Sequence, residues 1–229
     1  MRLVTRTAAA AAFLIGLALA APASAADDNQ LWTGVSATVK LADKWRLSED
    51  VTVRLSDRRD GLYEVESNTL LGYRLNKTVT AWGGYTHDSN YSAGHFTVME
   101  HRAREQVTFD NVAKLGRGRL SGRVRLEQRW REGIDGTGWR VRPYLKYTLP
   151  LRPGGRTALV LSSEPFFNLN RTSFQRSDGF DRVRNLIAVT TPITKNITAE
   201  IGYLNQYTSV RHGPDTDDHV ASVVLSLSL

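Results

Sequence analysis

The sequence predicts an all-β protein, a closed antiparallel transmembrane β-barrel of ten to twelve strands. Three observations predict this fold. Apolar and polar residues alternate with a period of two along almost the whole chain after Asp28, which is the pattern of β-strands. The alternating segments are about 10 to 15 residues long, longer than the usual strands of soluble sheets. Short and long connections take turns between them, as in membrane barrels with short periplasmic turns and longer outer loops.

Composition narrows the class of protein. The chain has 229 residues, of which 41% are hydrophobic and 23% are charged. No run of about 18 apolar residues follows the N-terminal segment, so an ordinary helical membrane protein is excluded. The chain contains no cysteine, which excludes disulfides, thiolate zinc sites and cysteine nucleophiles. The formal charge of +7 is compatible with an anionic partner.

The first 25 residues predict a secretory signal peptide. Arg2 and Arg6 form a positive start, Ala8 to Ala21 is a short apolar stretch, and Pro22 to Ala25 supplies the cleavage site. Cleavage after Ala25 leaves residues 26–229 as a single barrel domain with a net charge of +5. Because the chain is exported, we expect no nucleic-acid partner.

The first six predicted strands show the alternation clearly. In one of them, Trp45, Val51 and Leu55 share one face, and Arg46 and Arg54 share the other. The strands are predicted at 31–41, 44–56, 62–75, 78–87, 97–111 and 118–131.

The second part of the chain continues in the same way. Trp139, Val141 and Leu145 lie opposite Arg140 and Arg142. The remaining strands are predicted at 139–150, 156–168, 180–192, 196–208 and 217–229. The total of eleven conflicts with the even strand numbers of bacterial single-chain barrels. We therefore expect either that 31–41 is not a full spanning strand or that one segment contains a break.

The connections between the strands fall into two groups. Short turns are predicted at 76–77, 113–117, 152–155 and 194–196. Longer polar loops, which would lie on the outer side, are predicted at 57–61, 88–96, 132–138, 168–179 and 209–216.

Aromatic residues such as Trp45, Tyr73 and Trp139 lie near strand ends on the apolar face. This placement is typical of the aromatic girdles at the two membrane interfaces. A soluble barrel with an apolar core is the alternative, and it would turn the charged face outward. Glu49 and Glu105 interrupt the apolar face, and we expect a bulge or an interfacial position at each of them.

The charged face carries the main candidate site. In a membrane barrel this face must line the lumen, because the other face contacts lipid. Arginine and glutamate from neighbouring strands can pair bidentately and fill a narrow lumen, or they can line an anion path. The predicted lumen-lining residues are Arg102, Arg104, Arg123, Arg125, Glu127, Arg129, Arg140, Arg142, Glu164 and Arg184.

A rim-sited hydrolase acting on lipid or lipopolysaccharide is the enzymatic alternative. Its first candidates are His87 and Ser89, near the rim at the end of the predicted strand 78–87, where adjacent side chains on a strand would point to opposite faces and where we place a loop. The other candidates are His95, His101, His212 and His219. A nucleophile needs a base within hydrogen-bond reach, so this arrangement does not favour catalysis. We expect no enzyme activity, no catalytic residue, no metal and no cofactor.

The middle of the chain resembles a known family. His101-Arg102-x-x-Glu105-Gln106, Arg123-x-Arg125-Leu126-Glu127-Gln128-Arg129-Trp130 and Arg140-x-Arg142-Pro143-Tyr144 follow one another on adjacent strands. With Trp32 and the segment Glu164 to Asn168, these motifs resemble a bacterial outer-membrane β-barrel family catalogued as a domain of unknown function, the DUF2490 type. Chains of this kind usually end in Phe or Tyr, whereas this chain ends in Leu229.

The resemblance implies a Gram-negative outer-membrane barrel and no established activity. We expect a structural protein or a narrow, porin-like solute or anion pore, in contact with outer-membrane lipid and lipopolysaccharide and with small anionic solutes. A secreted soluble barrel that binds an apolar ligand remains the third hypothesis. Neither the oligomeric state nor the solute follows from the sequence.

Overall fold

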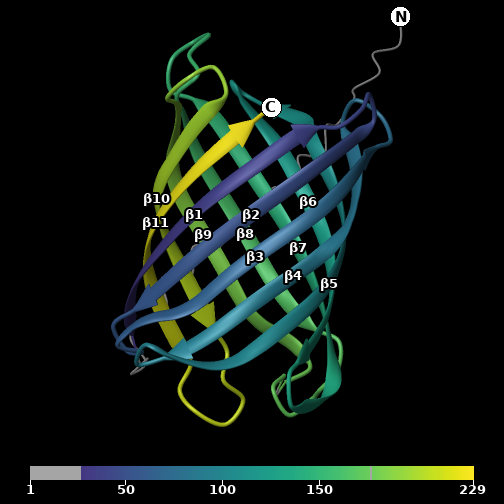
Figure 1. Ribbon diagram of the computed structural model, residues 1–229. Coiled ribbons are helices and arrows are strands. Elements are labelled where there is room, and N and C mark those ends of the chain that lie inside the picture. Colours follow the sequence, from purple (N-terminus) through teal and green to yellow (C-terminus); the bar gives the residue numbers. More distant parts are fainter. Residues whose placement is uncertain (1–26, 176) are drawn as a thin grey trace, which may run out of the picture.

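The computed structural model describes residues 27–175 and 177–229, and in these residues there is no helix. Eleven strands form one closed barrel, shown in Figure 1, so the predicted all-β class and closed barrel are confirmed. The predicted signal peptide, 1–25, lies outside the described residues. The strands are β1 (Asp28–Lys40), β2 (Trp45–Ser56), β3 (Gly61–Arg74), β4 (Val79–Ser92), β5 (His95–Leu115), β6 (Gly118–Arg131), β7 (Ile134–Pro150), β8 (Ala158–Asn168), β9 (Gly179–Pro192), β10 (Ile197–Thr208) and β11 (Thr216–Ser228).

The barrel closes through a parallel pair, which corrects the prediction of a wholly antiparallel sheet. Ten neighbouring pairs are antiparallel, and β1 pairs with β11 in parallel from Asp28↔Asp218 to Thr38↔Ser228. Figure 1 shows β1 (purple) and β11 (yellow) side by side with arrows in the same direction. Strands that alternate in direction leave the first and last parallel when their number is odd. Both explanations proposed for the odd count are therefore wrong, since β1 is a full strand and all eleven segments are strands.

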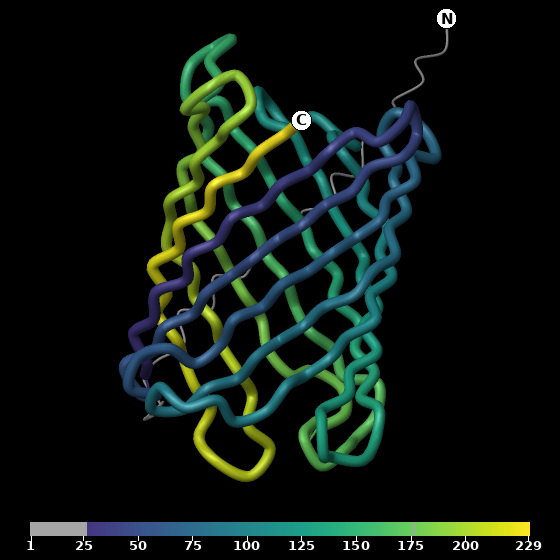
Figure 2. Tube along the Cα trace, in the orientation of Figure 1, coloured from purple at the N-terminus to yellow at the C-terminus, as the bar shows by residue number. Residues whose placement is uncertain are grey.

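The two ends of the barrel differ. At the end that we call the turn end lie residues 41–44, 75–78, 116–117, 151–157 and 193–196, together with Leu229. At the loop end lie Asp28 and residues 57–60, 93–94, 132–133, 169–175, 177–178 and 209–215. Figure 2 shows the loop end at the bottom, with 209–215 in yellow projecting from it.

Two of the predicted long loops are mostly strand, so the predicted rhythm of short and long connections holds only in part. β4 and β5 continue to a two-residue turn, Ala93-Gly94, instead of ending before residue 88. Both turn residues have positive φ, 48° and 76°, as a hairpin turn matched to the strand twist requires. The segment 132–138 likewise shortens to a turn at 132–133. The polar residues of 88–92 indicated a loop, but they continue the alternation of β4.

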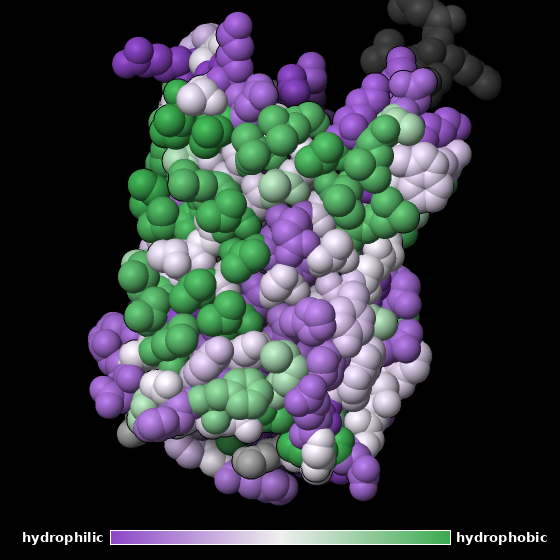
Figure 3. Space-filling view, viewed as in Figure 1, coloured by the Kyte–Doolittle hydropathy of each residue, from purple (hydrophilic) through white to green (hydrophobic). Residues whose placement is uncertain are grey.

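The faces of the barrel have opposite character. Outward side chains such as Val35, Val124 and Ile201 are 56%, 50% and 62% exposed. Figure 3 shows hydrophobic residues over much of this face and hydrophilic residues gathered at both ends, with some hydrophilic patches between. Exposed aromatic rings lie near both ends, with Trp45 packed on Tyr73 at the turn end and Phe167 packed on Phe180 at the loop end.

Glu49 and Glu105 do point outward, but neither sits at a bulge. The register shifts occur elsewhere, near residues 54, 90, 109, 129 and 166. Glu49 instead accepts hydrogen bonds from Ser67 Oγ, at 2.7 Å, and from Thr69 Oγ1 on the neighbouring strand. Gln128 Nε2 donates to Glu105 Oε1 at 3.3 Å. Neighbouring outward polar groups, and not local backbone irregularity, therefore accommodate these two carboxylates.

Candidate functional site

The interior of the barrel is charged. The period of two sends every second side chain of each strand inward, and on β6 this places Arg125 inside, 7% exposed, beside the outward Val124. All ten predicted lumen-lining residues lie on the inward positions of their strands. Eight of them are buried, namely Arg102, Arg104, Arg125, Glu127, Arg129, Arg140, Arg142 and Glu164, while Arg123 and Arg184 are partly buried.

Glu127 is the centre of the ion-pair network and is fully buried. Its Oε2 accepts from Arg140 Nη2 at 2.6 Å, and its Oε1 accepts from Arg142 Nη1 at 2.7 Å. Arg104 Nε lies 2.9 Å from Oε1. One carboxylate thus bridges guanidinium groups from β5 and β7, the two strands that flank β6.

Two other carboxylates extend the network around the lumen. Glu100 pairs with Arg129 at 2.8 Å and Arg131 at 2.7 Å, and Glu66 accepts from Arg102 Nη1 at 2.6 Å. Glu100 also accepts from Arg102 Nε, and Arg102 pairs with Asp88 as well, so this arginine joins three carboxylates. Three further ion pairs belong to the network, namely Arg142 with Glu164 at 2.9 Å, Arg123 with Glu164, and Arg54 with Glu64.

The network closes the middle of the barrel. Arg104 and Glu100 are each 1% exposed and Glu127 is 0% exposed. Water therefore does not reach the central charges, and each is compensated by ion pairs and hydrogen bonds, as buried charge requires. The arrangement is a packed layer of buried, ion-paired side chains in the middle of the barrel.

Aromatic rings separate arginines that would otherwise repel one another. The Cζ atoms of Arg54 and Arg184 lie 4.3 and 4.5 Å from the centre of the Trp32 ring. The Cζ atoms of Arg142 and Arg184 lie 4.2 and 4.8 Å from the centre of the Phe166 ring, and Phe166 is 1% exposed. Arg184 is therefore stacked between Trp32 and Phe166, where the ring faces favour a cation.

Between the packed layer and the loop end lies a cavity of about 240 Å³, which we call the cationic cup. All eleven strands contribute to its lining, so it lies on the barrel axis. Phe166, Tyr63 and Gln206 are in its wall. Trp32 lies behind the wall and stacks on the guanidinium group of Arg184. The charged lining of the cup consists of Arg54, Arg58, Arg59, Arg102, Arg129, Arg131, Arg140, Arg142, Arg182, Arg184, Glu64, Glu66, Asp88 and Asp218.

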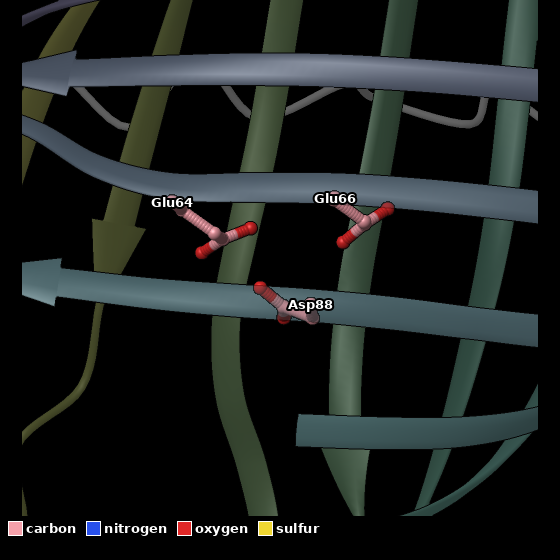
Figure 4. Close-up of side chains that lie close together, drawn as sticks. All are labelled: Glu64, Glu66 and Asp88. Carbon is pink, nitrogen blue, oxygen red and sulfur yellow. The ribbon is translucent and has the colours of Figure 1, made fainter. Parts of the chain in front are cut away.

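Three of the cup's carboxylates lie close enough together to suggest a cation site. Ligand oxygens of Glu64, Glu66 and Asp88 lie within 4.8 Å of one another, and Figure 4 shows these carboxylates together between β3 and β4. Each of them already binds a guanidinium group of Arg54 or Arg102. The arginines supply the positive charge, so this trio carries no metal site.

Several lining residues were missed in the sequence. Asp88 was assigned to a loop, although extending the predicted strand 78–87 by one residue would have placed it inside. Arg58 and Arg59 belong to the short connection 57–60, which has no periodicity to interpret. Trp32 and Phe166 lie on the inward positions of β1 and β8, and their contacts with Arg184 join strands that are far apart in the sequence.

The histidine candidates lie outside the barrel. His87 and Ser89 belong to β4 and not to a loop, and because they are two residues apart they share the outward face, which corrects the expectation of opposite faces. Ser89 Oγ contacts Met99 Sδ at 3.7 Å. His101, opposite His87 on β5, joins Tyr85 Oη at 2.7 Å to Glu132 Oε1 at 3.1 Å.

Two loop-end carboxylates outside the barrel wall are held in their charged form. The hydrogen bonds from Arg171 lower the pKa of Asp178, at 2.6 and 2.8 Å. The Tyr207 hydroxyl and the Val210 amide, the latter at 2.8 Å, lower the pKa of Asp215. These contacts hold Asp178 and Asp215 in place at the loop end.

Comparison with known proteins gives a family match over most of the chain. The family described as Protein of unknown function (DUF2490) matches residues 29–217, which span β1 to the start of β11. An uncharacterized protein of Methylorubrum extorquens is 28% identical over 222 residues, with 96% of each chain covered. No solved structure matches the chain.

Proposed function

The chain belongs to the family of proteins of unknown function designated DUF2490, and from that premise we propose that it is an outer-membrane β-barrel of a Gram-negative bacterium whose interior is closed. Its role is structural, and it conducts no solute through the packed layer. The N-terminal leader pattern, the strands of 11 to 21 residues and the aromatic rings near both ends support this proposal.

One observation carries the proposal, namely that the barrel is apolar outside and charged inside. Val124 is 50% exposed and its neighbours Arg125 and Glu127 are 7% and 0% exposed. In water the opposite order is favourable, since exposed apolar side chains gain from burial and buried charges lose hydration. In a bilayer, a closed barrel satisfies all backbone groups and presents apolar side chains to lipid.

The same observation opposes a soluble barrel that binds an apolar ligand. Such a barrel needs an apolar interior, whereas the cup is lined by fourteen charged side chains. Apolar inward residues such as Val160 and Val220 are buried by neighbouring side chains, at 2% and 0% exposure, and do not line the cup.

We propose no catalytic role for the outward histidines. The hydroxyl of Ser89 contacts a thioether and not an imidazole. His101 has a carboxylate and a phenol as its partners, an arrangement that fixes its orientation but offers no serine nucleophile. Loss of lipid deacylation in His87→Ala, relative to the parent protein, would instead establish the enzymatic alternative.

Two measurements test the proposal. The mature protein should fractionate with outer membranes, resist extraction at high pH and migrate differently on gels when boiled. In planar bilayers the refolded protein should give no steady conductance, because the ion-pair layer blocks the axis. A periplasmic, water-soluble protein would contradict the location, and a stable anion-selective conductance would contradict the closed interior.

A further inference from the structure

We propose that the cationic cup binds a small, multiply charged oxyanion of the phosphate-ester or polycarboxylate class, taken from the aqueous side of the loop end. The inference depends only on the interior of the barrel. It therefore holds whether or not the barrel spans a membrane, and it does not require the lumen to conduct. It extends the proposed function from a closed structural barrel to one with a ligand site at one mouth.

The charge of the cup is the first argument. Ten arginines and four carboxylates line it, a formal excess of six positive charges. Five carboxylates just behind the lining compensate part of this excess, namely Asp28, Glu100, Glu127, Glu164 and Asp181. They are shared with three more arginines, Arg104, Arg123 and Arg125. The carboxylate of Asp50 on β2 also faces Arg125 and Arg104. Thirteen arginines then face ten carboxylates, and three positive charges stay uncompensated within this set of described residues.

Arg184 is the second argument. Among the described residues, no carboxylate oxygen lies within 4.0 Å of its guanidinium group, and its one hydrogen bond runs from Nε to Gln206 Oε1 at 2.7 Å. Stacking between Trp32 and Phe166 fixes the plane of the group. An arginine that is oriented by stacking but lacks an acidic partner presents its remaining N–H donors in a rigid fork, the geometry that matches a phosphate or carboxylate.

The shape of the cup selects the size and the source of the ligand. About 240 Å³ is smaller than the ~300–1,000 Å³ of sites for drug-sized molecules, so a polymer chain does not fit. The floor is the packed ion-pair layer, and the mouth is formed by loop-end residues such as Arg58, Thr208 and Thr216. A ligand thus enters along the barrel axis. The phosphate of a lipid beside the barrel would have to cross the rim, which favours a soluble anion over a lipid headgroup.

Direct titration of the refolded full-length protein in detergent tests the proposal. We would use isothermal titration calorimetry with pyrophosphate and with citrate as probes, at low salt, and glucose as the uncharged comparison. We expect saturable binding of one pyrophosphate or citrate per barrel, weakened as salt screens the arginines, and no binding of glucose. A separate titration with phosphatidic acid in mixed micelles should give no saturable binding.

Three variants locate the site. Arg184→Gln should weaken binding at least tenfold. Gln206→Glu is nearly isosteric and places a carboxylate 2.7 Å from Arg184 Nε, which supplies the missing counter-charge. Gln206 Nε2 also donates to Asp218 Oδ2 at 2.7 Å, so the new carboxylate adds negative charge beside Asp218 as well, and both effects should weaken anion binding at least tenfold. Arg156→Gln removes an exposed arginine in the turn-end connection 151–157 and should leave the affinity unchanged. Heat-modifiable migration on gels reports whether each variant is folded.

The outcomes separate the possibilities. Loss of affinity in folded Gln206→Glu with normal affinity in Arg156→Gln supports the cup. Absence of saturable binding to the parent protein, or equal weakening by Arg156→Gln, overturns the proposal. Binding of phosphatidic acid without pyrophosphate overturns the soluble source. None of these results depends on fractionation or conductance, so failure here is distinguishable from failure of the proposed location.

Discussion

Glu127→Gln is the sharpest perturbation of the packed interior. The amide keeps the size and shape of the side chain but removes the charge at the centre of the network. Glu127 is the only carboxylate within 4.0 Å of Arg140 among the described residues, whereas Arg142 keeps Glu164 and Arg104 keeps Glu66. The substitution therefore leaves the buried guanidinium groups of Arg140 and Arg125 without a carboxylate within 4.0 Å among the described residues, and it weakens the compensation of Arg142 and Arg104.

The expected loss of stability follows from these contacts. Removing one member of a buried ion pair destabilises by about 3–5 kcal/mol, because the remaining charge stays desolvated. Glu127 lies within 4.0 Å of four arginines, so the loss should lie at the upper end of this range. At roughly 2–4 °C per kcal/mol for a chain of this size, the unfolding temperature should fall by roughly 10–20 °C.

Circular dichroism and the gel shift on heating, both on refolded protein in the same detergent, measure this change. Glu132→Gln is the matched control, since the Glu132 side chain is 63% exposed and, among the described residues, forms an ion pair only with His101. It should change stability by less than about 1 kcal/mol. Equal melting temperatures for Glu127→Gln and the parent protein would refute the packed network and indicate hydrated, screened charges.

Three further predictions concern single residues. Arg125→Ala should cost less than Glu127→Gln, about 1–3 kcal/mol in urea unfolding, because Arg125 lies 3.9 Å from Glu127 and its removal mainly leaves Gln106 without a partner; a larger loss than that of Glu127→Gln would contradict the assigned pairing. Val124→Lys should cost about 2–4 kcal/mol when unfolding is measured in lipid vesicles, since this outward residue faces the bilayer in our proposal; an unchanged value would argue against lipid contact. Arg171 lowers the pKa of Asp178, so this pair should stabilise the fold fully above an unfolded pKa of about 3.9, and the stabilisation should disappear as the pH falls through the lower folded pKa. The difference in melting temperature between Asp178→Asn and the parent protein should therefore shrink at low pH, and a difference that does not change with pH would contradict this pairing.

The alternation of residues was enough to predict the strands and their two faces. It also contained the central contacts, because Arg104, Glu127 and Arg140 are directly opposed in neighbouring strands. Once the hairpins are aligned, this row of three charges follows. The period alone does not say which face is inside, and strand length and aromatic placement supplied that choice.

The parts that were not predicted depend on the whole barrel. The parallel β1–β11 pair joins the two ends of the chain, and no local pattern marks it. The stacking of Arg184 between Trp32 and Phe166 joins β9 to β1 and β8, and the cup needs all eleven strands. Residues 88–92 were misassigned because Asp88 and Asn90 have the composition of a loop, although they face a polar lumen.

The central claim is that the apolar outer wall contacts lipid while the charges are inside. The chain has no native cysteine, so a single cysteine introduced at Val124, Ile187 or Ile201 is the only reactive thiol. These three side chains are exposed on the outer face of β6, β9 and β10. In isolated outer membranes we predict that a water-soluble maleimide labels them at least tenfold more slowly than a cysteine at Lys195 in the exposed turn 193–196, and that a membrane-partitioning maleimide labels them readily. Labelling of all four positions by the water-soluble reagent at the same rate would contradict the account.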